Sequence, residues 1–142
     1  MQELSPKQVE AFLAKRQKKT SKYKARRTKL DGIWFDSRAE AARYVILMQM
    51  LKRNEIRKLK LHPRFKLTDR HSYVADFSYD VIHREAVPDS HVIEDCKGFR
   101  TAVYKLKKQM MKELYGIDIL ETTVPASSVD ALLLGYLGQS CK

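Results

Sequence analysis

The chain has 142 residues, which is enough for one hydrophobic core but short for two independent domains. Its 28 Lys and Arg residues outnumber the 17 Asp and Glu residues, and the net charge of +11 indicates a polyanionic partner, most commonly a nucleic acid. The two cysteines, Cys96 and Cys141, favour neither a disulfide framework nor a zinc site. No window resembles a signal peptide or a membrane span, so we expect a soluble, cytoplasmic protein.

The first 30 residues form a strongly basic segment. They hold ten Lys and Arg residues against two acidic ones, so +8 of the total charge of +11 is concentrated there. Ser5 and Pro6 predict the start of a short helix through Gln17, and the rest has the character of an extended or disordered arm. We expect this arm to bind DNA, in particular through Arg26, Arg27 and Lys29. The alternative is a solvated tail that keeps the protein soluble.

Residues 31–142 are expected to form a single domain that begins with a turn, a short strand at Ile33–Phe35 and a helix over about residues 38–53. Ser37 suits the N-cap of that helix, and Glu40 completes a capping box. The spacing i, i+4, i+7, i+11 places Glu40 on the buried face of the helix. Its companions there are Tyr44, Leu47 and Leu51.

The middle of the chain alternates apolar and polar residues, as strands do. Pro63 divides residues 59–67 into two short strands or one bent strand. Residues 72–82 alternate without a break and predict a single strand, with Tyr73, Ala75, Phe77 and Tyr79 on one face. A polar turn at residues 83–90 and a strand at residues 91–99 complete a hairpin with a long tip.

The last third of the chain predicts a helix, a strand and a further helix. Thr101 and Gly116 suit the two caps of a helix over residues 101–115, whose expected buried stripe is Val103, Leu106, Met110 and Leu114. A strand follows at residues 117–124, and a helix follows Pro125. The order of these elements predicts an α/β fold with one mixed β-sheet flanked by helices.

The hairpin strand "VIEDCKGF" carries charged residues where a buried strand should be apolar. Because side chains alternate along a strand, Asp95 and Lys97 share one face and Glu94 points to the other. Asp76 on the partner strand is expected opposite Asp95, and Glu40 supplies a third carboxylate. Such an oxygen-rich site suits Mg²⁺ or Mn²⁺, which would lower the pKa of a bound water for phosphodiester hydrolysis. Lys97 would orient the nucleophile or stabilise the transition state.

These pieces resemble the PD-(D/E)xK motif of the restriction-endonuclease-like nuclease superfamily, with Asp76 in "VADF", Asp95 and Lys97 in "IEDCKG", and the helix glutamate Glu40 in "SRAEAARY". Ala75 stands where the motif usually has proline. The resemblance implies a restriction-endonuclease-like αβββαβ core and metal-dependent DNA cleavage, with the backbone carbonyl of Cys96 as a further metal ligand.

A narrower resemblance, over about residues 23–120, is to a family of small phage-encoded proteins of unassigned function. It is carried by "DGIWFDSRAEAARY", "YVADFSYD", "IEDCKGFRT" and "YKLKKQMMKELYGIDI". Small phage members of the superfamily often act as homodimers on branched DNA. An endonuclease of the Holliday-junction or flap type, in the host cytoplasm, is therefore the expected function.

Further DNA contacts are expected on and before the second predicted helix. A basic stripe there consists of Lys105, Lys108 and Lys112. We expect it to bind phosphates, and the alternative interpretation is a helix face that only contacts solvent. Lys107 lies on the apolar side, from which it would reach either the surface or the site. Arg100 and Tyr104 are further candidates.

Each site residue also has a purely structural interpretation. Glu40 could serve only as a capping residue, and Asp95 and Lys97 could form an ordinary ion pair. Glu94 and Cys96 are expected to be structural, and the histidines (His62, His71, His83 and His91) are expected on the surface.

Two rival functions stay open. The first is a non-catalytic DNA-binding or recombination-accessory protein with the same fold. The second is an anti-host or packaging factor of a phage that docks through "ALLLGYLG".

Overall fold

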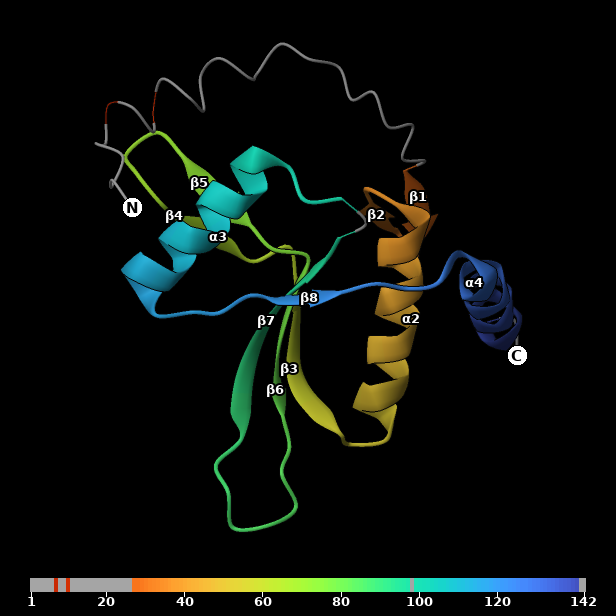
Figure 1. The fold of residues 1–142 in the computed structure, drawn as a ribbon. Helices are drawn as coiled ribbons and strands as arrows, with labels where there is room; N and C mark the ends of the chain where they lie inside the picture. Colours follow the sequence, from red (N-terminus) through yellow and green to blue (C-terminus); the bar gives the residue numbers. More distant parts are fainter. Residues whose placement is uncertain (1–6, 8–9, 11–26, 98, 141–142) are drawn as a thin grey trace.

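The structure is a computed structural model that describes Lys7, Glu10, residues 27–97 and residues 99–140 (Figure 1). The helix predicted for residues 5–17 therefore lies outside the described residues, apart from Lys7 and Glu10. The same holds for the predicted arm up to Arg26.

A four-stranded mixed sheet forms the centre of the molecule. Its strands lie in the order β3 (Ile56–Leu61), β6 (Phe77–Val81), β7 (Ser90–Cys96) and β8 (Leu120–Thr122). The β3–β6 and β6–β7 pairs are antiparallel, and the β7–β8 pair is parallel. With α2 (Arg38–Lys52) before the sheet and α3 (Ala102–Tyr115) joining β7 to β8, the chain follows an αβββαβ order. The predicted α/β fold class, a mixed sheet flanked by helices, is confirmed.

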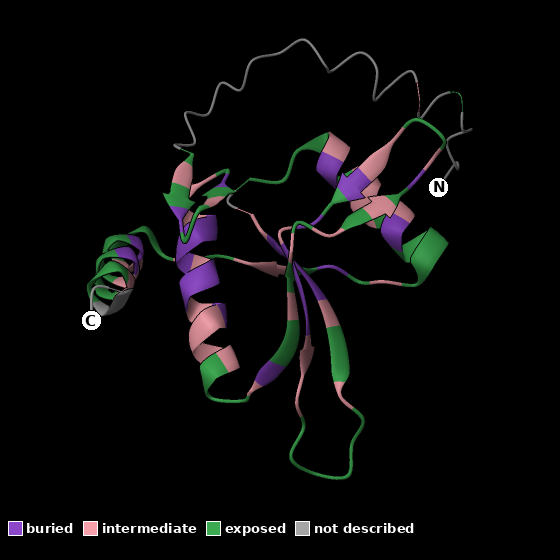
Figure 2. Cartoon of the chain, turned by 180° about the vertical axis from the view of Figure 1, so that it is seen from behind, coloured by how far each residue is buried: buried purple, intermediate pink, exposed green. Residues whose placement is uncertain are grey.

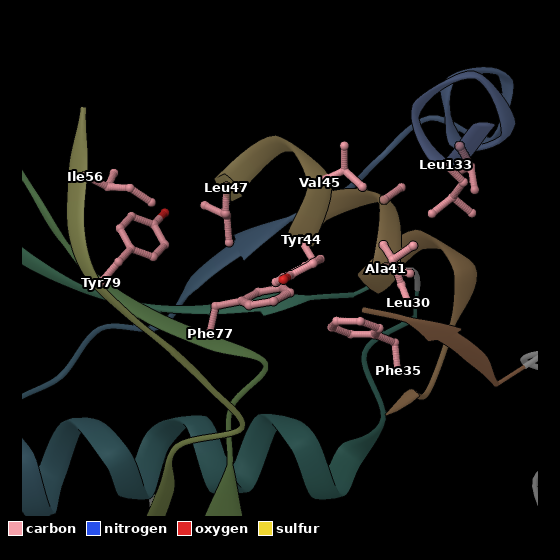
Figure 3. Packing of buried hydrophobic residues seen from close by; sticks show 12 residues of the cluster. Leu30, Phe35, Ala41, Tyr44, Val45, Leu47, Ile56, Phe77, Tyr79 and Leu133 are labelled. Carbon is pink, nitrogen blue, oxygen red and sulfur yellow. The ribbon is translucent and has the colours of Figure 1, made fainter. Parts of the chain in front are cut away.

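The two helices cover opposite faces of this sheet (Figure 1). One core cluster joins α2 to Ile56, Phe77 and Tyr79 of the sheet (Figure 3). A second cluster joins Tyr104 and Met111 of α3 to Ile93 of β7. The C-terminal helix α4 (Ala126–Ser140) packs against α2 through Val129 and Leu133. The sheet therefore separates two apolar compartments, and residues on opposite faces of one strand belong to different surroundings.

The prediction of one continuous strand at residues 72–82 is wrong. The chain bends at Ala75 and Asp76, so that β5 (Ser72–Val74) pairs with β4 (Arg64–Lys66) in a separate ribbon while β6 enters the central sheet. Tyr73 packs in the α3 cluster, whereas Phe77 packs in the α2 cluster. Apolar alternation persists through the bend because each half has its own core to face, which hides the bend from the sequence pattern.

A β-hairpin precedes α2, and the predicted boundary at residue 30 falls inside it. β1 (Thr28–Leu30) pairs with β2 (Ile33–Phe35) across a two-residue turn. Asp31 and Gly32 in that turn have φ angles of 52° and 76°, the left-handed backbone that tight hairpin turns require. Leu30 and Phe35 are buried in the α2 cluster, so residues 28–30 pack as part of the domain.

The caps of α3 are as predicted, but its buried stripe is not. The Thr101 hydroxyl accepts a hydrogen bond from Tyr104 N at 3.1 Å, and Gly116 ends the helix in the left-handed conformation. Tyr104 and Met111 are the buried residues of the helix, whereas Leu114 of the predicted stripe is 56% exposed. The helix is rotated from the expected face because residues i and i+7, Tyr104 and Met111, pack on Ile93 and Ile119.

The tip of the β6–β7 hairpin, residues 82–89, extends beyond the sheet (Figure 1) and is mostly exposed (Figure 2). The last pairing of the two strands joins Val81 to Ser90, and Ile82 N donates to Glu55 O at 2.9 Å beside the start of β3. Among the helices of the described residues, none has the length and apolar character needed to cross a bilayer.

Candidate functional site

The structure brings two predicted acids together where the chain bends into the central sheet. The backbone N of Asp76 donates to Glu94 O at 3.2 Å, which extends the antiparallel register and places Asp76 opposite Asp95. Asp76 Oδ2 accepts a hydrogen bond from Cys96 N at 2.7 Å. Asp95 is completely buried, and its carboxyl group lies against that of Asp76. Two acids far apart in the sequence thus form one carboxylate pair.

This pair is electrostatically strained. Burial and the adjacent Asp95 raise the pKa of Asp76 to about 8, and the charge of Glu40 contributes to the same shift. Near neutral pH the pair consequently retains a proton that an exposed aspartate would lose. A bound cation would remove the repulsion that favours this proton.

Asp95 is also held by a hydrogen bond from one neighbour and by an ion pair with another. Tyr73 on β5 donates a hydrogen bond to Oδ2, and Lys97 Nζ lies 2.9 Å from Oδ1. Among the described residues no hydrogen bond of good geometry reaches the buried Oδ1, but the ammonium group of Lys97 forms an ion pair with it. This oxygen already faces one cation, and a metal ion bound there would share it with Lys97.

Lys97 lies between the carboxylate pair and α3. Its Nζ atom is 5.2 Å from the centre of the Tyr104 ring, a cation–π contact. Burial opposes the charge of Lys97, but Asp95, Asp76 and Glu40 outweigh this effect and raise its pKa. Lys97 is therefore a fixed positive charge beside the two acids.

Glu40 is buried at the start of α2 and makes more contacts than a capping role needs. The Ser37 hydroxyl accepts from Glu40 N at 3.1 Å, as predicted for the N-cap. The Glu40 carboxylate, however, accepts from Asp36 N at 3.1 Å, and its other oxygen lies 2.9 Å from His62 Nε2. The backbone N of His62 donates to Asp76 O at 3.0 Å. His62 thus connects the helix carboxylate to the strand that carries Asp76.

Glu94 points to the opposite face of the sheet, as the strand parity predicted. Arg43 of α2 binds both of its carboxylate oxygens, at 2.5 and 3.0 Å. The hydroxyls of Tyr79 and Thr122 donate to the same carboxylate at 2.5 and 2.8 Å. Since four donors already occupy it, Glu94 serves to hold α2 on the sheet and has no oxygen left for a metal.

Cys96, between Asp95 and Lys97, is half-buried. Burial, followed by the charges of Asp76, Glu94 and Glu40, raises the pKa of its thiol to about 12. The thiol therefore stays protonated at neutral pH and is unsuited to be a nucleophile.

The predicted DNA-binding residues are distributed over two regions. Arg27 and Lys29 lie at the β1–β2 hairpin, while Arg26 lies outside the described residues. Arg100, Tyr104 and Lys108 converge on Glu121 of β8: Arg100 forms an ion pair with it, and Tyr104 Oη and Lys108 Nζ lie 3.0 and 2.7 Å from its carboxylate.

Not all of the predicted α3 residues face solvent. Tyr104 is buried, so its ring points into the molecule. Lys107 donates to Ser72 O at 3.0 Å, so its side chain runs from α3 to β5, and burial lowers its pKa. Lys105 is exposed, and Lys112 lies 2.9 Å from Asp118.

The donor set fits a hard divalent cation of the Mg²⁺ type. In the described ranges no group of three or more His, Cys, Asp or Glu side chains is arranged around a common point. Magnesium, however, is commonly bound by one or two carboxylates and completes its shell with water and substrate phosphate. Asp76 and Asp95 supply such a pair, and the Oδ1 atom of Asp95 already lies 2.9 Å from a cation, the ammonium group of Lys97.

Three residues of this site, His62, Tyr73 and Glu121, are not identified from the sequence. Tyr73 was expected on the face opposite Asp76, and only the bend at residues 75–76 makes it reach Asp95. Glu121 is the register partner of Asp95 in the parallel pair, which a strand pattern cannot fix without the pairing. For His62, its place beside Pro63, at the end of a strand, was the available signal.

A family model described as "Protein of unknown function (DUF1064)" matches residues 20–124. Comparisons with the curated proteins and with the solved structures gave no match. The matched range ends before α4, so the whole carboxylate site lies within it.

Proposed function

The chain belongs to the DUF1064 family, and we propose that it is a metal-dependent DNA endonuclease of the PD-(D/E)xK type. One observation carries the proposal: half-buried Asp76 lies against fully buried Asp95, and Lys97 is ion-paired to Asp95. Two acids held side by side with little solvent must either repel each other or retain a proton, and a structural role does not require such a pair. A cation bound between the two carboxylates would offset their repulsion, and binding such a cation is therefore the role that we assign to the pair.

The metal, Mg²⁺ or Mn²⁺, would be held by Asp76, Asp95 and the backbone carbonyl of Cys96, with Glu40 supporting a second ion or its water. When bound, it would supply a more acidic water and polarise the scissile phosphate. Asp76 is oriented for its part by the hydrogen bond from Cys96 N, and Asp95 by the hydrogen bond from Tyr73.

Lys97 would stabilise the negative charge that develops on the phosphate or position the attacking water. Its raised pKa keeps it protonated, so it acts as a cation and not as a base. The Tyr104 ring against its ammonium group and the ion pair to Asp95 restrict where that charge can lie. A fixed charge avoids the reorganisation that a mobile side chain would require.

DNA is the proposed substrate because of the charge of the chain. The net charge of +11 favours a polyphosphate, and Arg27, Lys29, Arg100 and Lys105 are exposed cations on the described surface. Branched DNA, of the junction or flap type, is the substrate that we propose first. The alternative is a non-catalytic DNA-binding protein that retains the fold.

The deciding experiment is cleavage of labelled linear, flapped and four-way DNAs in the presence of Mg²⁺ or Mn²⁺. The wild type should cut at least one of them, and EDTA should stop the reaction. Asp95→Asn and Lys97→Ala should each lower the rate by at least about 100-fold. Matched controls are Asp69→Asn in an exposed loop and Lys52→Ala at the end of α2, which should cut at the wild-type rate.

Two results would contradict the proposal. If the wild type binds these DNAs but cuts none in either metal, the non-catalytic alternative is favoured. If both site variants cut as fast as the two controls, hydrolysis does not depend on this carboxylate pair.

We further propose that the active species is a homodimer that contacts a second copy through α4. Asp130 is the only Asp, Glu, Lys, Arg or His in this helix, and it forms an ion pair with Arg38. Leu134 and Leu137 on its outer face are 70% and 51% exposed. In a chain of net charge +11, a neutral apolar face is where two copies meet with least repulsion.

A further inference from the structure

The β1–β2 hairpin has two faces of different chemistry. Its inner face contributes Leu30 and Phe35 to the core under α2. Its outer face carries Arg27, Lys29 and Trp34, of which Lys29 and Trp34 are directly opposed across the two strands. The inner face explains why the hairpin folds, but it does not explain the residue types on the outer face.

Trp34 is the only tryptophan of the chain, and 52% of it is exposed on that outer face. The guanidinium carbon of Arg27 lies 5.3 Å from the centre of its ring, and Lys29 Nζ lies 5.7 Å from the same point. Both distances are within the range of a cation–π contact. The Arg27 charge is also 3.8 Å from Asp36, an exposed pair of little energetic weight.

The hairpin adjoins the carboxylate site through the backbone. β2 ends at Phe35, and the next residue, Asp36, donates its backbone N–H to the Glu40 carboxylate. The outer face therefore starts two residues from a direct contact with Glu40. A ligand on Trp34 would therefore lie two residues along the chain from Asp36, which binds Glu40.

An exposed indole ring beside two cationic side chains is a combination that binds single-stranded nucleic acid. Bases stack on an aromatic ring whatever their sequence, while adjacent cations bind the backbone phosphates. A base inside an intact duplex is stacked between its neighbours and cannot use the ring in this way. The arrangement consequently distinguishes DNA with unpaired bases from blunt duplex DNA.

We propose that the outer face of the β1–β2 hairpin is a stacking platform for an unpaired DNA base, with Trp34 as the stacking ring and Arg27 and Lys29 as phosphate contacts. This inference rests on the proposed function for its ligand class, DNA. It adds the feature by which the protein would select a flap, a gap or an opened junction beside its carboxylate site.

Because Trp34 is the only tryptophan, its fluorescence reports on the platform directly. The full chain is titrated in EDTA with oligo-dT and with a blunt duplex of equal phosphate number. We expect saturable quenching by oligo-dT and much weaker quenching by the duplex. Anisotropy of labelled oligo-dT should show roughly tenfold weaker binding for Trp34→Leu and near wild-type binding for Trp34→Phe, which keeps an aromatic ring.

A matched control is Tyr115→Leu, which removes an exposed aromatic ring at the far end of α3 and should leave oligo-dT binding unchanged. Equal quenching by duplex and oligo-dT, or unchanged affinity in Trp34→Leu, overturns the inference. So does emission that depends on protein concentration alone, because a second copy would then cover the hairpin.

The titration contains no free metal and measures no cleavage, so it is independent of the test of the nuclease proposal. Stacking on Trp34 without any hydrolysis in Mg²⁺ would keep this inference and remove the enzyme. Hydrolysis in Mg²⁺ without quenching of Trp34 would keep the nuclease proposal and remove this inference.

Discussion

At the scale of single residues, the main feature is that the surroundings of Asp76 oppose its negative charge. Its carboxyl group is half-buried beside Asp95, and its pKa is raised to about 8, against about 4 in an unfolded chain. Between these two values the folded protein keeps a proton that the unfolded chain has released. The contribution of Asp76 to the free energy of unfolding therefore falls as the pH rises from about 4 to about 8.

This gives a prediction for Asp76→Asn in EDTA. The wild type should lose roughly 2–5 kcal/mol of stability through this group between pH 5 and pH 8, and the variant should lose that slope. Urea unfolding at several pH values measures the difference. At pH 8, Mg²⁺ or Mn²⁺ should raise the Tm of the wild type but not that of the variant.

Asp69→Asn is the control, because it removes the same charge from an exposed loop and should behave as the wild type does. A wild type whose pH dependence and metal response equal those of Asp76→Asn would show that Asp76 is not a strained metal ligand.

The alternation of side chains along a strand was enough to predict, from the sequence, that Asp95 and Lys97 share one face and that Glu94 points to the other. The contact from His62 to Glu40 was beyond reach, because it depends on where the chain goes after Pro63. The contact from Tyr73 to Asp95 was equally hidden, since the bend after β5 changes which face Tyr73 presents. The alternation of apolar and polar residues assigns side chains to faces only along a straight strand, and it gives the wrong face where the strand bends.

At the scale of elements, α2 is attached to the sheet by both apolar packing and a buried ion pair. Arg43 of α2 reaches Glu94 of β7, which also accepts from Tyr79 on β6 and Thr122 on β8. One carboxylate therefore joins a helix to three strands. Its removal would leave the Arg43 charge and two hydroxyls without their acceptor.

We accordingly predict that Glu94→Ala lowers the free energy of unfolding by about 3–5 kcal/mol. The double variant Glu94→Ala with Arg43→Met should regain part of this loss, because the uncompensated charge is then gone. Chemical denaturation of the two single variants and the double variant measures the coupling.

A loss below about 1 kcal/mol in Glu94→Ala would contradict this role. Metal-induced stabilisation should persist in any Glu94 variant that folds, which distinguishes Glu94 from Asp95.

The boundaries of α2 and α3 followed closely from local chemistry. Ser37, Thr101 and Gly116 mark helix ends because their backbone needs are local, and the structure confirms all three. The rotation of α3 did not follow, because both Tyr104 and Leu114 are apolar and only the sheet decides which of them is covered.

At the scale of the whole molecule, the charge is unevenly distributed. The N-terminal 30 residues hold +8 of the +11, whereas α4 holds one acidic residue and no basic one. The composition alone indicated the polyanionic partner, while the neutral outer face of α4 needed the structure to be recognised. We propose different partners for these two regions, DNA for the first and a second copy for the second.

We predict that the wild type elutes and scatters light as two chains, and that the double variant Leu134→Ser with Leu137→Ser does so as one. Both positions are exposed, so the variant should fold with a Tm close to that of the wild type. Light scattering after size exclusion, over a range of concentrations, measures the mass.

Val87→Ser on the hairpin tip is the matched control, since it also replaces an exposed apolar residue. A monomeric wild type, or a dimer that the double variant leaves intact, would exclude α4 as the interface.

The long tip of the β6–β7 hairpin has a consequence for how this sequence can vary. The two strands carry Asp76 and Asp95 at one end and are joined through the tip at the other, with the pairing finished at Val81 and Ser90. Insertions or deletions among residues 83–89 would leave every pairing of β6 with β7 in register. One end of this hairpin is therefore free to diverge among relatives in length and composition, while the other must keep its spacing residue by residue.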